Sequence, residues 1–457
     1  MPHRPKFLQE IRALLRLAGP IILSQIAQVL MGLVDTVMAG HAGAGELAVV
    51  GLGVALWIPV FISLMYVVQA VSPVIAHHFG AGDLEAVARD AREGIWLAAA
   101  LSVVPLLVMP WTPHLLTLAG IAPALAHRTG VFLWGICLGM PAALVYRALA
   151  FYSASINHPR PIMVLAFVGL ACNAALNWVL IYGHLGFPAM GGAGCGWATG
   201  VGMWVALLLL VAWTARASDY KPTYVWRNWT LPHWPAQKRL LRIGLPMGGA
   251  GLAEVAAFCS VAVLVGRFGA EQIGANQIAL NFSSLIFMLP MGLSSALAIR
   301  VGHSLGARDP RGARRIAWTG IALGLVIAGL AIGPIVGLRH AVAALYTADA
   351  TVRVIAADLL LFAACWQFFD ATQVCAMGAL RGYKVTLLPM VLMGVAFWAF
   401  GIPVGWWLAY RGFGDHGPLE VYGFWVGLVI GLVLVSIALV AALRKIANEA
   451  VGSGHPT

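Results

Sequence analysis

Three carboxylic acids, Asp35, Glu254 and Asp370, lie inside long apolar segments, while the other 14 of the 17 Asp and Glu residues fall in loops or near segment ends. An acid near the middle of a membrane helix costs about 2.5 to 3.5 kcal/mol on insertion scales, so such residues are usually functional. The alternative is a structural acid that is hydrogen-bonded by its neighbours. We interpret the three acids as sites for a positive ion or a proton.

Polar residues near Asp35 follow helical spacing. Gln28, Met31 and Asp35 are three and four residues apart, which places them on one helix face. Asn173 and Asn177, four residues apart in a later segment, would offer their amides to Asp35 if the two helices approach. The alternative for these asparagines is a structural role, in which they only hydrogen-bond neighbouring helices.

Glu254 and Asp370 also have polar or aromatic neighbours at helical spacing. Phe258 lies one turn beyond Glu254, where its ring would face a bound cation or simply pack in the core. Gln367 and Gln373 flank Asp370 at three residues on either side. A polar stripe on the next long segment of this half comprises Gln277, Asn281, Ser284 and Met288.

This set of side chains suits the exchange of cations across a membrane. Carboxylate and amide oxygens bind a hard monovalent cation, and two acids can exchange a proton. A carboxyl group in a low-dielectric environment keeps its proton near neutral pH, and a bound cation displaces that proton. Competition among a proton, a metal ion and an organic cation is therefore sufficient for antiport. Na⁺ and H⁺ both remain candidates, because both bind the same carboxylates.

The composition predicts that membrane helices position these residues. Apolar residues make up 61% of the 457 positions and charged residues 10%, far from the roughly 25% charged residues of soluble domains. A helix of about 20 residues crosses the hydrocarbon layer. The sequence therefore predicts an all-α membrane protein with twelve spans near 13–39, 47–77, 94–111, 129–150, 161–183, 194–215, 240–266, 273–299, 316–338, 354–379, 385–410 and 421–443.

The net charge of +11 is distributed unevenly between the two sides of the predicted membrane. With both termini in the cytoplasm, 23 of the 28 Lys and Arg residues, Arg147 among them, fall in the inner segments. This asymmetry predicts a multi-pass membrane protein with cytoplasmic termini. We expect its location to be the bacterial inner membrane. A concentrated basic face with stacking aromatics is lacking, so we expect no nucleic-acid partner.

No sequence motif indicates an enzyme. The chain lacks HExxH, GxSxG, GxxxxGK[ST] and paired CxxC motifs. Its six cysteines lie in or beside the predicted spans, where packing explains them better than disulfides or metal. We therefore expect no catalytic residues and no cofactor beyond a transported Na⁺ or H⁺.

The second half of the sequence repeats the first at one constant shift. Pro20, Gly40, His77 and Asp83 recur as Pro246, Gly266, His303 and Asp309. Six spans in each half give two parallel repeats, which predicts an N-terminal six-helix lobe (1–215), a cytoplasmic linker (216–239) and a C-terminal six-helix lobe (240–457). Such repeats form a central site that rocking of the lobes exposes to either side in turn.

Several motifs resemble the multidrug and toxic compound extrusion family, NorM branch. These are the Val-Asp-Thr-Val-Met-Ala-Gly segment at 34–40 and the turns Gly-Ala-Gly-Asp at 80–83 and Gly-Ala-Arg-Asp at 306–309. The likeness extends over about residues 8–447. It implies two lobes of six helices, rocker-switch alternating access, and efflux of cationic drugs in exchange for Na⁺ or H⁺.

The resemblance also implies roles for individual residues. Glu254 and Asp370 would form the cation site, a Na⁺ site if sodium is the coupling ion, and Asp35, Asn173 and Asn177 the acidic cluster of the N-terminal lobe. The chain departs from the family at Phe287, where some relatives carry Tyr, and at the asparagines, where some carry a second acid. The side chains expected to line the cavity are Gln28, Phe258, Gln277, Asn281, Phe287 and Gln367.

Three other functions compete with an exporter. A flippase for lipid-linked precursors shares this architecture, but its anionic substrates would require buried Arg or Lys where we expect acids. A membrane enzyme would need a catalytic cluster near one surface, and a passive channel would not need two acidic sites. We expect a drug exporter, acting as a monomer in the lipid bilayer on small organic cations.

Overall fold

The computed structural model describes residues 4–223, 225–227, 229–347, 349–412 and 417–453. Within these ranges the chain forms twelve helical spans that are long and apolar enough to cross a membrane, and no β-strand. Helices are expected there, because a bilayer offers no water to hydrogen-bond the backbone. The all-α prediction with twelve spans is confirmed. The ends of the predicted domains, residues 1–3 and 454–457, lie outside the described residues.

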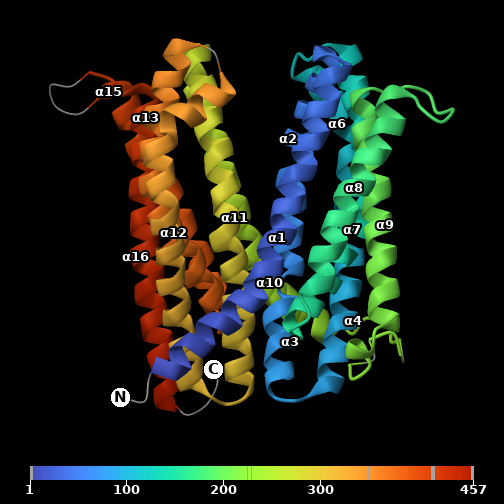
Figure 1. Ribbon diagram of the computed structural model, residues 1–457, viewed down its shortest axis with the longest axis vertical. Coiled ribbons are helices and arrows are strands. Elements are labelled where there is room, and N and C mark those ends of the chain that lie inside the picture. Colours follow the sequence, from blue (N-terminus) through green and yellow to red (C-terminus); the bar gives the residue numbers. More distant parts are fainter. Residues whose placement is uncertain (1–3, 224, 228, 348, 413–416, 454–457) are drawn as a thin grey trace. The chain divides into compact units, whose positions relative to one another are not determined.

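The first six spans contain several breaks (Figure 1). The third span, predicted as one segment at 94–111, is interrupted near Pro105 and Pro110, because proline cannot donate the helical hydrogen bond. The elements are α1 (Arg4–Ala42), α2 (Ala44–Val68) with α3 (Val71–Gly80), α4 (Leu84–Leu101) with α5 (Val103–Val108), η1 (Met109–Trp111) and α6 (Thr112–Leu118), α7 (Pro123–Ser155), α8 (Arg160–Tyr182) and α9 (Gly192–Arg216).

The last six spans include a π-helical turn in their fifth member. Two short one-turn elements, η2 (Ser218–Tyr220) and η3 (Gly266–Phe268), lie outside the long helices. The long elements are α10 (Trp234–Val265), α11 (Ala270–Gly306), α12 (Pro310–Tyr346), α13 (Ala350–Gly382), α14 (Leu387–Gly394) with the π-helical η4 (Val395–Gly401) and α15 (Ile402–Arg411), and α16 (Glu420–Ser453).

The two halves repeat the same helix ends. The second span of the first half begins at Ala44 and ends at Gly80. The equivalent helix of the second half, α11, begins and ends at the corresponding repeat positions, Ala270 and Gly306. Asp83 and Asp309 cap the following helices, each accepting a hydrogen bond from a backbone N–H three residues later at 2.9 and 2.8 Å. The preceding residue is left-handed in both halves, Gly82 at φ 75° and Arg308 at φ 57°. The predicted glycine turn is therefore made by glycine in the first half only.

Packing divides the described chain into two units. We call residues 23–248 the amino-terminal unit, and the described residues up to Ile22 and from Gly249 onward the carboxy-terminal unit. Both boundaries fall at equivalent repeat positions, since the shift that relates Pro20 to Pro246 also relates Ile22 to Gly248. The units therefore differ from the predicted sequence halves by an exchange of the first turns of α1 and α10.

Contacts within each unit explain this exchange. α11 passes so close to α1 that a Cβ on Gly292 would lie 2.3 Å from a side-chain carbon of Ile22, and Arg300 of α11 donates to Glu10 of α1 at 2.8 Å. In the amino-terminal unit, α10 approaches α2 so closely that a Cβ on Gly244 would lie 2.4 Å from the carbonyl oxygen of Val67. The first helix of each repeat therefore contributes to both units.

Helices α7 and α9 pack through glycines on both sides. A Cβ on Gly196 would lie 2.1 Å from the carbonyl oxygen of Phe132, and a Cβ on Gly200 would lie 2.1 Å from that of Gly135. Gly139 faces Gly200 in the same contact. Small residues spaced by four allow two membrane helices to approach this closely, where dispersion between their backbones stabilises the pair.

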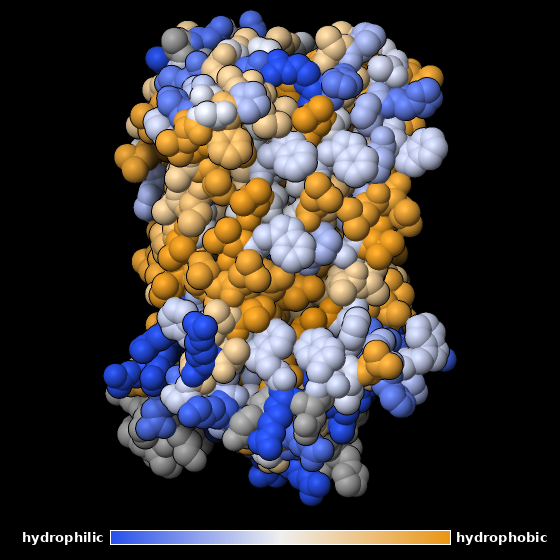
Figure 2. Space-filling view, turned by 90° about the vertical axis from the view of Figure 1, so that its right-hand side faces the viewer, coloured by the Kyte–Doolittle hydropathy of each residue, from blue (hydrophilic) through white to orange (hydrophobic). Residues whose placement is uncertain are grey.

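The surface of the spans is apolar. Figure 2 shows one face of the molecule with hydrophobic residues across its middle and hydrophilic residues toward both ends. On α8 and α9, the large side chains Phe167, Trp178, Val201 and Leu208 are exposed. Exposed apolar groups over such a band are expected where lipid tails, rather than water, surround the helices.

The linker predicted at 216–239 packs against α4 in the amino-terminal unit. Arg92 donates to the carbonyl oxygen of Arg227 at 2.6 Å, and the carboxylate of Glu93 accepts from the backbone N–H of His233 at 2.9 Å. Residues 224 and 228 lie outside the described part of this linker. These contacts attach the linker to the lobe that precedes it.

One side chain at the same repeat position caps the last helix of each half. Glu46 accepts from both terminal nitrogens of Arg128 at 2.5 Å and from the backbone N–H of Gly192 at 2.6 Å. In the second half, Gln272 accepts from the backbone N–H of Val421 at 3.1 Å. The beginning of α9 is thus bonded to α2, and the beginning of α16 is bonded to α11, the repeat of α2.

Replacing Glu46 by Gln is expected to lower the stability of the folded protein, because the neutral amide removes a two-pronged, charge-assisted contact with Arg128. The expected loss is about 1 to 3 kcal/mol, measured as a lower midpoint of thermal unfolding in detergent. Glu85→Gln is the matched control, since Glu85 also lies in a first helical turn but is exposed. Equal midpoints for the two variants would contradict the role of the Glu46 contact.

Candidate functional site

The acids of the carboxy-terminal unit come from two helices. α10 carries Glu254, which is partly buried, and α13 carries Asp370, which is 1% exposed. The two carboxyl groups are close enough to repel each other electrostatically. Arg381, three turns further along α13, attracts Glu254. The site therefore combines two acids with one basic residue inside membrane-spanning helices.

Three polar atoms of α13 within one turn of Asp370 lack hydrogen-bond partners among the described residues. These are Asp370 Oδ2, Gln373 Oε1 and Gln367 Nε2, and all three are buried. The Gln373 amide nitrogen donates instead to the sulfur of Met393 at 3.3 Å. Two of the three atoms are oxygens one helical turn apart, which is the donor type that a hard cation prefers. The arrangement can accept a cation, or a proton on either acid.

Aromatic side chains surround this site. Phe258 packs against Trp366 with ring centroids 5.4 Å apart at an interplanar angle of 60°. Trp398, in the π-helical turn, donates to the carbonyl oxygen of Ala253 at 3.0 Å, directly beside Glu254. Extra-residue turns of this kind often occur at functional sites, because they redirect a side chain. Here the turn places an indole donor against the helix that carries the acid.

The amino-terminal unit holds a second acidic cluster. Asn177 donates to Asp35 Oδ1 at 2.5 Å and to Asn173 Oδ1 at 3.2 Å. Thr199 of α9 donates to Asp35 Oδ2 at 3.5 Å, and Asn173 donates to Thr199 at 3.4 Å. Three helices thus meet at one carboxylate, and the structure brings together the three residues proposed for this lobe.

The remaining candidate residues lie elsewhere. Gln277 and Asn281 are exposed on α11 and hydrogen-bond each other at 3.2 Å, and Phe287 on the same helix is partly buried. Gln28 is not part of the Asp35 cluster, because its side chain accepts from Arg147. The roles proposed for these residues in lining a cavity stay predictions.

Three participating residues were not identified from the sequence. Thr199 gives no pattern, because a single threonine in an apolar helix is common. Arg147 was assigned to an inner segment, yet it lies within α7, partly buried, and Arg381 is 9% exposed within α13. Two basic residues therefore lie within the spans, Arg381 near Glu254 and Arg147 beside Gln28. The repeat could have identified Arg147, since its constant shift relates Arg147 to Gln373, which lies one turn beyond Asp370 in the second half.

Comparisons with known proteins identify the family of the chain. Residues 20–179 and 246–407 match the MatE family. A probable multidrug resistance protein NorM of Chromobacterium violaceum is 39% identical over 98% of this chain and 96% of its own length. The multidrug resistance protein PmpM of Pseudomonas aeruginosa is 40% identical over 96% of this chain and 92% of its own.

Solved structures show the same fold. A eukaryotic MATE transporter aligns with a TM-score of 0.85 at 20% identity, over 98% of this chain and 99% of its own. An outward-facing multidrug resistance MATE family transporter aligns with a TM-score of 0.86 at 20% identity, over 96% of each chain. The chain belongs to the MatE family, that is, to the NorM-like multidrug and toxic compound extrusion proteins that its motifs resemble.

Proposed function

We propose that this protein is a secondary active exporter of organic compounds, chiefly cations, and that it couples their efflux to the entry of Na⁺ or H⁺. The observation that supports this proposal most strongly is the pair of acids, Glu254 and Asp370, inside membrane-spanning helices, together with the unpartnered buried oxygens of Asp370 and Gln373. The relatives named as multidrug resistance proteins support the class of substrate.

The mechanism follows from competition for the acids. When the coupling ion or proton occupies the site of the carboxy-terminal unit, the organic cation is displaced. Release of the coupling ion or proton on the other side of the membrane then frees the acids again. The parallel repeat suits alternating access by rocking of the two six-helix lobes. Exchange of one coupling ion for one monovalent organic cation moves no net charge, so the concentration gradient of the coupling ion drives it. Each further charge that enters at roughly 100 mV supplies about 2.3 kcal/mol, which corresponds to about a fiftyfold concentration ratio.

The proposed location is the bacterial inner membrane, with both termini in the cytoplasm. The beginning of α1 and the end of α16 lie at the same end of the carboxy-terminal unit (Figure 1). The Lys and Arg residues concentrate in the segments that this orientation places inside, as the positive-inside rule requires. We further propose that the monomer is the transporting unit, because each of the two acidic clusters is formed within one chain.

The test is efflux of an organic cation, such as ethidium, from vesicles that contain the purified protein. Na⁺ and pH gradients are imposed separately, each with and without a membrane potential. We expect one of the two gradients to drive efflux against the concentration gradient of ethidium, while protein-free vesicles show none. Ethidium that only equilibrates under every gradient would show a passive pathway and overturn the proposal.

A further inference from the structure

At the repeat positions of two cation-site residues of the second half, the first half carries an amide and a positive charge. The shift that relates Pro20 to Pro246 also relates Gln28 to Glu254 and Arg147 to Gln373. An acid and an amide on the first and fourth helices of the second half are thus an amide and a guanidinium in the first half. A positive charge in a membrane helix is costly, so its presence at this position requires an explanation.

Arg147 is held between two side chains of the amino-terminal unit. One terminal nitrogen donates to Gln28 Oε1, and the guanidinium carbon lies 5.7 Å from the ring centroid of Phe61. The Gln28 amide in turn donates to the carbonyl oxygen of Ser24 at 3.3 Å. Within the described part of the chain, no carboxylate forms a salt bridge with Arg147. One neutral acceptor therefore faces a group with five N–H donors.

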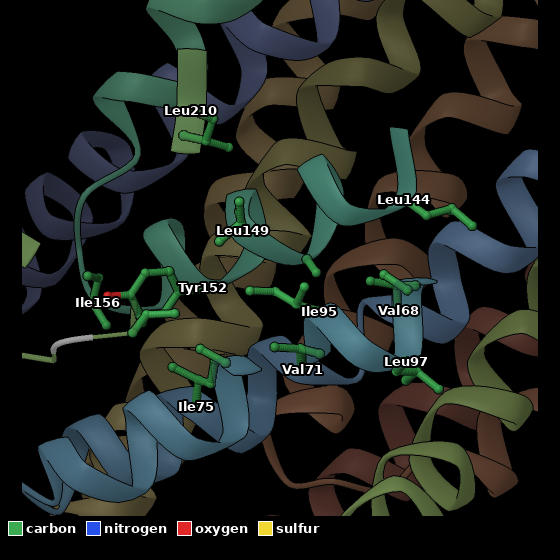
Figure 3. Packing of buried hydrophobic residues seen from close by; sticks show 14 of the residues in the cluster. Val68, Val71, Ile75, Ile95, Leu97, Leu144, Leu149, Tyr152, Ile156 and Leu210 are labelled. Carbon is green, nitrogen blue, oxygen red and sulfur yellow. The ribbon is translucent and has the colours of Figure 1, made fainter. Parts of the chain in front are cut away.

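The surroundings of Arg147 are largely apolar. Leu144, at the repeat position of Asp370, is fully buried in a hydrophobic cluster with Leu149 and Tyr152, which Figure 3 shows from close by. Phe61 packs against the same cluster. A low dielectric strengthens the attraction between this guanidinium and an anion, and its flat array of donors matches a carboxylate in two-pronged geometry.

A negative charge lies on the same helix face as Gln28. Asp35 is seven residues further along α1, two helical turns or about 10 Å, and belongs to the same unit. The amino-terminal unit thus carries the carboxylate of Asp35 and the guanidinium of Arg147. Among the described residues these two groups form no salt bridge with each other. A molecule that carries both a cationic and an anionic group would match the two.

We propose that Arg147 and Gln28 form a subsite for the carboxylate of amphoteric substrates, whose cationic group is attracted by Asp35. The inference rests on the proposed export function and assigns recognition of the anionic group of a substrate to Arg147 and Gln28. A substrate that is only cationic uses the acids alone, whereas a substrate with a carboxylate gains a charge-assisted hydrogen bond to Arg147.

Equilibrium binding of two matched dyes to the purified full chain tests this proposal. Rhodamine B carries a cationic ring system and a free carboxylate, and its ethyl ester carries the cation alone. Fluorescence anisotropy gives the affinity ratio of the two dyes for the wild type, Arg147→Met, Arg147→Lys and Asp35→Asn. Arg160→Met is the control, since Arg160 is exposed at the beginning of α8.

We expect Arg147→Met to shift the affinity ratio against the free carboxylate by about tenfold or more, and Arg147→Lys to retain part of the preference. Asp35→Asn should weaken both dyes, and Arg160→Met should leave the ratio at its wild-type value. An unchanged ratio in Arg147→Met, with the protein monodisperse, would overturn the proposal. Failure of the export function would appear separately, as wild-type vesicles that do not expel the ester under any gradient.

Discussion

Glu254→Gln and Asp370→Asn are each expected to abolish gradient-driven efflux, so that the variants only equilibrate an organic cation across the membrane. Each substitution replaces a carboxylate by a neutral amide of similar size. The amide keeps the packing of α10 or α13 but cannot bind a proton or balance a cation. The concentration ratio that the coupled gradient sustains, about fiftyfold for each net charge that enters at roughly 100 mV, would be lost.

Vesicle efflux under imposed Na⁺ and pH gradients measures this effect, and the amount of protein inserted is determined for each variant. Glu449→Gln is the matched control, because Glu449 is exposed near the end of α16 in the same unit. Efflux at the wild-type rate in both acid variants would show that coupling takes place elsewhere. Loss of insertion would instead indicate a structural role for these acids.

Gly200→Val is expected to prevent the amino-terminal unit from folding. Even the Cβ of the new residue would lie 2.1 Å from the carbonyl oxygen of Gly135, and a backbone atom cannot move away as a flexible side chain can. Helices α7 and α9 would have to separate along the contact that also includes Gly196. Overpacking of a core typically costs about 1 to 3 kcal/mol, and clashes with backbone cost more.

Gly202→Val provides the control for this variant. Gly202 lies two residues further along α9, and no atom lies within 4 Å of the position that a Cβ would take there. The two variants make the same change in helix propensity, so their difference isolates the contact. We expect monodisperse protein for Gly202→Val and little or none for Gly200→Val, measured by size-exclusion chromatography in detergent. Similar yields would contradict close packing at Gly200.

The helices could be predicted because apolar length and the cost of unsatisfied backbone groups are local properties of the sequence. The observed helix ends extend beyond the predicted spans, since α11 and α13 have 37 and 33 residues, more than the about 20 that cross the hydrocarbon layer. The π-helical turn at Val395–Gly401 could not be predicted. Its one extra residue per turn depends on packing against other helices and leaves no periodic pattern.

The sites were predictable to the extent that a buried charge is unusual. Asp35, Glu254 and Asp370 stand out in apolar segments, and the spacing of Asn173 and Asn177 indicated a common face. Their contacts depend on which helices become neighbours, and this is decided by tertiary packing. Long side chains such as Arg147 are also ambiguous near a span end, where they can extend toward either the membrane surface or the bundle.

The exchange of the first turns between α1 and α10 bears on how the chain is made. Glu10 meets Arg300, which follows 290 residues later, and a ribosome that adds about 5 to 20 residues per second needs roughly 15 to 60 s to synthesise that interval. During this time the beginning of the nascent chain waits in the bilayer without its neighbours. The carboxy-terminal unit can therefore complete its packing only after its earliest segment has been inserted and the later helices have been made.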